Sequence, residues 1–144
     1  MAKAHNFPYQ YGFVEGRKIP YPIVNVTLDT VRGRRQYAFI MDSGADQCTM
    51  PQYMMLLMDV DKTKLTESQS RGIGKDLTKT REGPITIEFC GKKISLRCSF
   101  TDNNKTPLLL GKSGIFELFN ISFDNDKGAT IFEERITTRG TSKR

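Results

Sequence analysis

The sequence has few of the residues from which metal sites and disulfide frameworks are built. Its 144 residues include one histidine, His5, and three cysteines, Cys48, Cys90 and Cys98, with no C-x-x-C pair. Structural zinc sites need four cysteine or histidine ligands at short spacings. An odd number of cysteines without paired spacing is typical of reduced thiols that fill a core. We therefore expect no metal, no cofactor and no disulfide framework.

Long apolar runs are also absent. No segment is apolar over the length that a membrane-spanning helix needs, and the first residues contain no apolar signal-peptide core. No internal repeat or linker divides the chain, whose length suits one domain with a hydrophobic core. We expect a cytoplasmic protein that does not enter a membrane.

Positive charge is in moderate excess, with 22 Lys and Arg against 16 Asp and Glu and a net charge of +6. The basic residues are spread over several turns and the C-terminal tail, whereas a nucleic-acid interface tends to form one dense stripe with aromatic residues in it. The spread favours solvated turns. A small basic β-barrel that binds nucleic acid stays as a minor alternative, based on the net charge and on the segment 71–81.

Short alternating or apolar segments separated by turn residues predict a mostly β protein. We expect strands at 22–29, 36–41, 84–90, 93–100, 107–111, 120–124 and 129–134. Short helices are expected at 52–60, directly after a proline, and at 112–119. The polar residues 59–71 are expected to form a loop. About seven or eight short strands with one or two short helices are typical of a β-barrel or sandwich.

The ends of the chain differ in composition from its middle. Residues 1–19 are aromatic and contain glycine, and we expect them to form an arm, a removable leader or an added edge strand. The folded domain is expected at residues 20–136. Residues 137–144 are basic and polar and are expected to be a disordered tail.

The stretch FIMDSGADQCTMP, residues 39–51, places a carboxylate at the end of an apolar strand. Asp-Ser-Gly alone is ordinary turn chemistry. Because the residues before Asp42 are apolar, however, its carboxylate lies near the protein interior, where a charge is costly unless it has partners. Gly44 permits a close backbone approach, and the Ser43 hydroxyl can hold a neighbouring backbone group. The loop is therefore a candidate site for a carboxylate that acts as a general base.

This stretch resembles the active-site loop of the retropepsin-like aspartic proteases, and three further stretches follow in that family's order. Gly72-Ile73-Gly74 resembles the flap tip, ITIEFCGKKISLRCSF resembles the hairpin after the flap, and PLLLGKSGIF resembles the apolar-glycine-basic element with its short helix. The resemblance runs from about Pro20 to Glu134. It implies an all-β fold, the retropepsin-like closed acid-protease β-barrel with one or two short helices.

The resemblance also implies roles for individual residues. Asp42 would be the catalytic aspartate. Ser43, Gly44 and Ala45 would support the active-site loop, with Ser43 making a hydrogen bond between the two loops of a dimer. Gly44 and Asp46 would bind the main chain of the substrate.

Two further sets of residues follow from the same resemblance. Asp46 would pair with Lys112, which stands where the family often has arginine. Since lysine offers no planar fork of donors, we expect a looser brace. Gly72, Ile73 and Gly74 would close over the substrate.

The sequence contains Asp-Ser-Gly once and no Asp-Thr-Gly. Two carboxylates that share one proton supply both an acid and a base, so the resemblance implies a homodimer with two Asp42 residues across its twofold axis. The expected function is an aspartic endopeptidase that uses an Asp-activated water to hydrolyse peptide or protein substrates. The main alternative is a catalytically inactive retropepsin-like module for dimerisation or peptide binding.

Overall fold

The computed structural model describes residues 3–71 and 77–136. The expected flap residues Gly72, Ile73 and Gly74 lie outside these ranges. The chain forms two compact units. We call residues 24–114 the barrel unit and residues 1–23 together with 115–144 the terminal unit.

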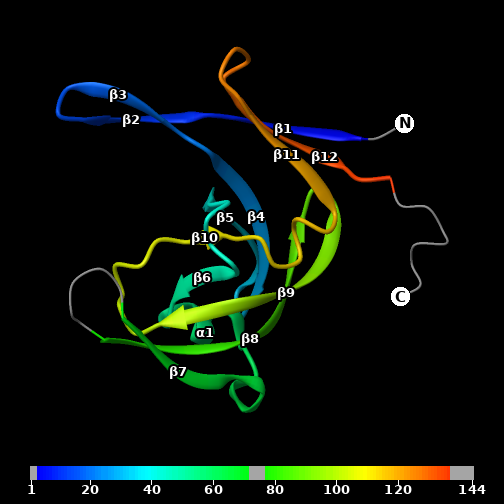
Figure 1. Ribbon diagram of the computed structural model, residues 1–144. Helices are drawn as coiled ribbons and strands as arrows, with labels where there is room; N and C mark the ends of the chain where they lie inside the picture. The colour runs from blue at the N-terminus through cyan, green and yellow to red at the C-terminus, as the bar shows by residue number, and fades with distance from the viewer. Residues whose placement is uncertain (1–2, 72–76, 137–144) are drawn as a thin grey trace. The chain divides into compact units, whose positions relative to one another are not determined.

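The barrel unit contains a closed ring of strands (Figure 1). Its members are β4 (Ile23–Thr30), β5 (Gly33–Met41), β6 (Cys48–Pro51), β8 (Leu77–Phe89), β9 (Lys92–Thr101) and β10 (Leu109–Leu110). They neighbour one another in the order β4-β5-β10-β6-β9-β8, and the pairing of Thr27 with Glu88 closes the ring between β4 and β8. The mostly β fold with a closed barrel that the sequence predicts is confirmed.

The interior of the barrel unit follows the alternation seen in the sequence. Val24, Val26 and Leu28 project from one side of β4 and are buried, as period-two alternation requires. Met50, Met54 and Met55 are also buried and fill space around α1 (Tyr53–Met58). These methionines therefore serve as core residues.

One strand of the barrel unit was not expected. Residues 59–71 contain the 3₁₀ turn η1 (Lys62–Lys64) and then β7 (Thr66–Arg71), where the sequence predicts a loop. The prediction was wrong because β7 has no apolar residue to reveal its period. Its stability comes from pairing with β8 along its whole length, from Thr66 opposite Glu82 to Arg71 opposite Leu77.

The helix predicted at 112–119 is absent, and this segment consists of turns. Gly114 has a φ of +76°, which a right-handed helix cannot contain. The Ser113 hydroxyl, expected as a helix cap, instead accepts a hydrogen bond from the Arg97 N–H at 3.3 Å. Only the glycine allows this path, since a Cβ at Gly114 would lie 2.7 Å from the Leu96 Cβ.

Two buried cysteines face each other inside the barrel unit. Cys48 on β6 lies opposite Cys98 on β9. Burial is the main cause that raises the pKa of the Cys98 thiol well above its ordinary value, and a hydrogen bond with Cys48 is the second cause. The folded state therefore favours the neutral thiol. This contribution to stability is complete below the unfolded pKa, about 8.5 to 9, and is lost as the pH rises above it.

We expect the alkaline loss of stability to be smaller in Cys98→Val than in the wild type. Valine has a similar volume, suits a strand and does not titrate. Urea unfolding at pH 7 and pH 10 measures the difference, and comparing the two proteins removes the contribution of lysines and tyrosines. Equal losses in both proteins would contradict the assignment to Cys98.

The terminal unit has a three-stranded antiparallel sheet and a separate hairpin. The sheet contains β1 (Ala4–Pro8), β12 (Ala129–Glu134) and β11 (Phe119–Asp124), with β12 in the middle, and the hairpin contains β2 (Gln10–Val14) and β3 (Arg17–Tyr21). Phe132 is fully buried, with the rings of Phe7 and Phe119 edge-on to it at 5.6 Å. Within the expected arm, β1 thus takes the form of an added edge strand. The boundaries at residues 19 and 136 stay predictions.

No helix in residues 3–71 and 77–136 has both the length and the apolar character that crossing a membrane requires.

Candidate active site

The candidate loop, residues 42–47, connects β5 to β6. The end of β5 lies parallel to β10, with Ile40 opposite Leu109 and Met41 opposite Leu110. This pairing continues into the loop, because the Asp42 N–H donates to the Leu110 carbonyl at 2.9 Å. The backbone of Asp42 is therefore fixed by a strand that comes much later in the sequence.

The Asp42 carboxylate is oriented by its own loop. The Gly44 N–H donates to Asp42 Oδ1 at 2.9 Å, and the Ala45 N–H donates to the Asp42 carbonyl at 3.1 Å. Asp42 is half-buried. Its Oδ2 accepts no hydrogen bond from the described residues, so one oxygen is held and the other remains available to a water or a second carboxyl group.

The far side of the loop is fixed by the residues after β10. The Lys112 N–H donates to the Ala45 carbonyl and the Ser113 N–H donates to the Asp46 carbonyl, both at 2.9 Å. Gly111 permits this contact, because a Cβ there would lie 2.5 Å from the Gln47 carbonyl oxygen and 2.7 Å from that of Ala45. Two backbone segments are thus in direct contact at Gly111.

Side chains at the rim of the loop are exposed. Lys112 Nζ lies 3.2 Å from Asp46 Oδ1, and these side chains are 41% and 92% exposed. Such an exposed ion pair contributes little to stability. Ser43 is exposed too, and its hydroxyl has no hydrogen-bond partner among residues 3–71 and 77–136.

Comparison with known proteins identifies the fold. No protein-family model matches the sequence, and no curated protein matches it. Among solved structures, the chain is similar to a retropepsin-like aspartic protease from Rickettsia conorii, with a TM-score of 0.59 and 16% sequence identity over 93% of this chain and 94% of that chain. The chain has the retropepsin-like fold. EIAV protease complexed with the inhibitor HBY-793 matches with a TM-score of 0.46 and 19% identity over 70% of this chain and 88% of that chain.

The retropepsin-like fold brings together most of the residues singled out in the sequence. Asp42, Ser43, Gly44, Ala45 and Asp46 share one loop, and Lys112 lies against it. Their functional roles stay predictions, as do those of the three flap residues. Gly111 is not predicted as a site residue from the sequence. Its position at the end of an apolar run, directly before Lys112 of the expected brace, could have indicated one.

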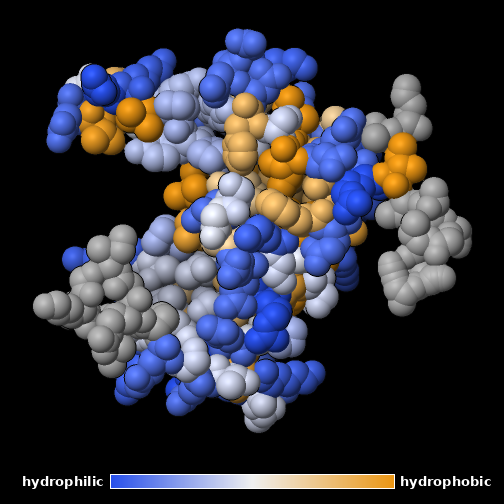
Figure 2. All heavy atoms as spheres, viewed as in Figure 1, coloured by the Kyte–Doolittle hydropathy of each residue, from blue (hydrophilic) through white to orange (hydrophobic). Residues whose placement is uncertain are grey.

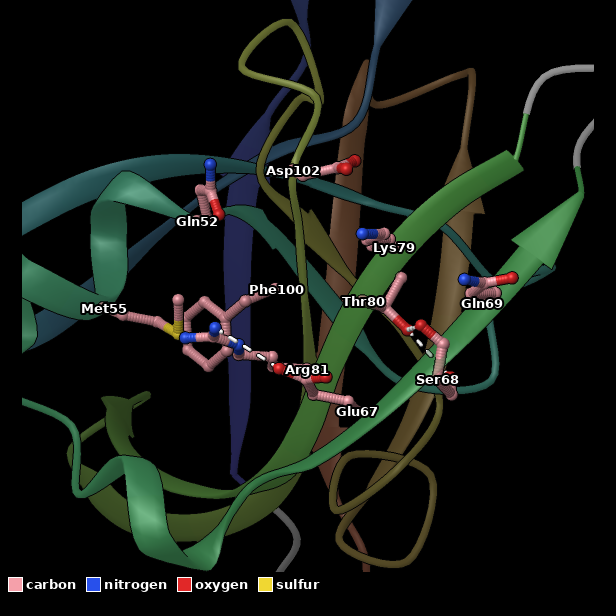
Figure 3. Close-up of a pocket in the computed structure, with 10 residues that line it drawn as sticks. All are labelled: Gln52, Met55, Glu67, Ser68, Gln69, Lys79, Thr80, Arg81, Phe100 and Asp102. Atoms are coloured by element: carbon pink, nitrogen blue, oxygen red, sulfur yellow. Dashed lines mark hydrogen bonds and ion pairs between the residues drawn. The ribbon is translucent and has the colours of Figure 1, made fainter.

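The barrel unit also has a cavity of about 400 Å³ (Figure 3). Its lining comes from α1, β7, β8, β9 and adjoining residues, namely Gln52, Met55, Glu67, Ser68, Gln69, Lys79, Thr80, Arg81, Phe100 and Asp102. Arg81 pairs with Glu67 at 3.3 Å, and the Ser68 and Thr80 hydroxyls lie 2.9 Å apart. None of the residues that line this cavity belongs to the candidate loop, residues 42–47.

Proposed function

We propose that this protein is an aspartic endopeptidase whose active site forms from two Asp42 residues across a homodimer. The observation that carries the proposal is the state of the Asp42 carboxylate. One of its oxygens is held by the Gly44 N–H at 2.9 Å, on a loop tied by backbone hydrogen bonds to the residues at the end of β10. A carboxylate with fixed position and one available oxygen suits general acid–base catalysis. The retropepsin-like fold supports the same conclusion.

The proposed reaction needs two carboxyl groups in different protonation states. The ionised Asp42 takes a proton from water, whose oxygen attacks the carbonyl carbon of the scissile peptide bond. The protonated Asp42 of the second chain gives its proton to the carbonyl oxygen, which yields a neutral tetrahedral diol. On collapse of the diol, the Asp42 that took the proton from water gives it to the amine nitrogen, the other Asp42 takes a proton from a diol hydroxyl, and the C–N bond breaks. The products are a carboxylic acid and an amine, and no covalent enzyme intermediate forms.

The substrate class follows from the groups beside Asp42. In this proposal the Gly44 carbonyl and the Asp46 side chain hydrogen-bond the main chain of an extended peptide. Asp46 is exposed and therefore accessible to a substrate. Main-chain recognition selects extended or unfolded segments over folded protein.

A subunit-mixing experiment tests the shared site. Wild-type chains are mixed with equal amounts of Asp42→Asn chains, allowed to exchange, and assayed on an unfolded protein substrate. With random pairing, about one quarter of the dimers carry two Asp42 residues, so activity per wild-type chain is expected to fall to about half. A statine-type peptide, which resembles the tetrahedral intermediate, is expected to inhibit the wild type.

Each outcome has a distinct meaning. Undiminished activity per wild-type chain in a fully exchanged mixture would rule out the shared pair of carboxylates. Binding of the statine-type peptide by a wild type that cleaves nothing would favour the inactive peptide-binding module.

A further inference from the structure

One wall of the cavity in Figure 3 is a face of the sheet formed by β7, β8 and β9. Residues directly opposite each other in an antiparallel pair share a face, as do residues two apart on one strand. Glu67 lies opposite Arg81, which in turn lies opposite Phe100. Gln69 lies opposite Lys79 in the neighbouring row. Two rows of side chains on one face of the sheet therefore line the cavity.

The opposite wall comes from α1 and the residue before it. Gln52 and Met55 line the cavity from this side, across from the residues of β7 and β8 (Figure 3). Met55 and Phe100 are 5% and 1% exposed, so the base of the cavity is apolar and buried. Asp102 extends the row of Lys79, because its N–H donates to the Lys79 carbonyl at 3.1 Å. The cavity thus combines an apolar base with a polar rim. In Figure 2, which colours the whole surface by hydropathy, polar and apolar residues alternate over the visible face of the molecule.

The polar side chains of the cavity differ in whether the chain itself supplies their partners. Arg81 pairs with Glu67 at 3.3 Å, and the Ser68 and Thr80 hydroxyls lie 2.9 Å apart. Four other lining side chains make no hydrogen bond or ion pair within residues 3–71 and 77–136, namely Gln52, Gln69, Lys79 and Asp102. All four are exposed. Water therefore solvates them, and a ligand that offers matching groups can replace that water.

These four side chains define a ligand by complementarity. The Lys79 ammonium suits a carboxylate, and the Asp102 carboxylate suits an ammonium. Each glutamine amide both donates and accepts hydrogen bonds, as a peptide group does. The buried base of Met55 and Phe100 suits an apolar side chain. We propose that this cavity binds a short peptide with a free amino end, a free carboxyl end and an apolar side chain.

The volume and the charges of the cavity limit the choice of ligand. About 400 Å³ lies within the range of small-molecule sites and suits a peptide of about two or three residues. A phosphate or a nucleotide would meet the carboxylates of Glu67 and Asp102, which repel it. This inference rests on the cavity alone and goes beyond the proposed function, since it holds whether or not the chain cleaves peptides.

Titration calorimetry of the full chain with the dipeptide leucyl-phenylalanine at low ionic strength tests the proposal. Lys79→Met and Asp102→Asn are each expected to raise the dissociation constant about tenfold, because each removes one charged partner of the ligand; this factor corresponds to about 1.4 kcal/mol. Lys127→Met is the matched control, since Lys127 is an exposed lysine of the terminal unit, and its dissociation constant is expected to equal that of the wild type. Thermal unfolding checks that each variant folds.

Dipeptides with blocked ends test which residue binds which end. The C-terminal amide of leucyl-phenylalanine is expected to bind the wild type about tenfold more weakly than the free acid does, whereas Lys79→Met is expected to bind both equally. N-acetylation is expected to act in the same way with Asp102→Asn. Groups in contact give non-additive effects, so amidation that weakens binding to Lys79→Met as much as to the wild type would overturn the assignment of the carboxylate to Lys79.

Two results would overturn the proposed site as a whole. One is a wild type that binds no leucyl-phenylalanine at millimolar concentrations. The other is a dissociation constant that is the same for the wild type, Lys79→Met and Asp102→Asn.

A competition experiment separates the cavity from the proposed active site. A statine-type peptide that is acetylated and amidated has no free ends, so it is expected to leave binding of the dipeptide unchanged. Displacement of the dipeptide by this peptide would assign the binding to Asp42 and contradict the cavity site. Asp42→Asn is expected to bind the dipeptide as the wild type does while it cleaves nothing, so failure of the protease and failure of the cavity site give different results.

Discussion

Replacing Asp42 with asparagine is expected to lower kcat/KM for peptide hydrolysis by about 10⁴-fold or more. Each positioned acid or base contributes about 10² to 10⁴ to the rate, and the substitution removes both members of the proposed pair. Asparagine has the shape of aspartate, and its Oδ1 can still accept the hydrogen bond from the Gly44 N–H. The loop is therefore expected to keep its conformation, but residue 42 can no longer accept a proton from water or donate one to the substrate.

Rates with an unfolded protein or a peptide substrate measure this effect. Asp29→Asn is a suitable control, because Asp29 is an exposed carboxylate on β4 outside the candidate loop, and its activity is expected to equal that of the wild type. Thermal unfolding of both variants shows whether the fold is retained. An Asp42→Asn protein that cleaves within tenfold of the wild-type rate would refute the proposed mechanism.

Replacing Gly111 with alanine is expected to lower the free energy of unfolding by about 3 kcal/mol or more and to abolish cleavage. The added methyl group would lie 2.5 Å from the Gln47 carbonyl oxygen and 2.7 Å from that of Ala45. Both neighbours are backbone atoms, which cannot rotate away as a side chain can, so one segment must move. The loop of Asp42 lies on one side of this contact and is expected to be displaced.

Urea unfolding and the cleavage assay measure the two consequences, and the melting temperature is expected to fall by about 10 °C. Gly91→Ala provides the control, because Gly91 has a φ of +76° and nothing within 4 Å of its added Cβ. That variant is expected to lose about 1 kcal/mol through backbone strain alone and to keep its activity. Gly111→Ala with wild-type stability and activity would show that the two segments have room to separate.

The strands that the sequence reveals are those that bury one face. In β4, Val24, Val26 and Leu28 alternate with polar residues and are all buried, so the pattern and the structure have the same cause. The end of β5 buries Phe39 and Met41 on one face, while Ile40 on the other face is half-buried. This burial also identifies Asp42, since a carboxylate directly after such a strand stands out from an ordinary turn.

The elements that the sequence does not reveal are those set by contacts distant in the chain. β7 is polar on both faces, and its ladder with β8 alone defines it. Residues 5–13 are aromatic at every odd position, but Pro8 and Gly12 stand between them, and both residue types weaken a strand prediction. Gly111 depends on a contact with Gln47 and Ala45 that no local pattern encodes. Ser113 resembles a helix cap in sequence, yet its hydroxyl accepts a hydrogen bond from the N–H of Arg97 on β9.

The anchoring of Asp42 by Leu110 has a consequence for how the protein is made. Contacts between residues far apart in sequence form late in folding, because a long loop must close first. During synthesis, the β5 end emerges from the ribosome well before β10, and until then the Asp42 N–H lacks the carbonyl that fixes it. A nascent chain therefore cannot assemble the proposed site before β10 has been made. The proposed protease would be inactive until nearly all of its barrel unit had been translated.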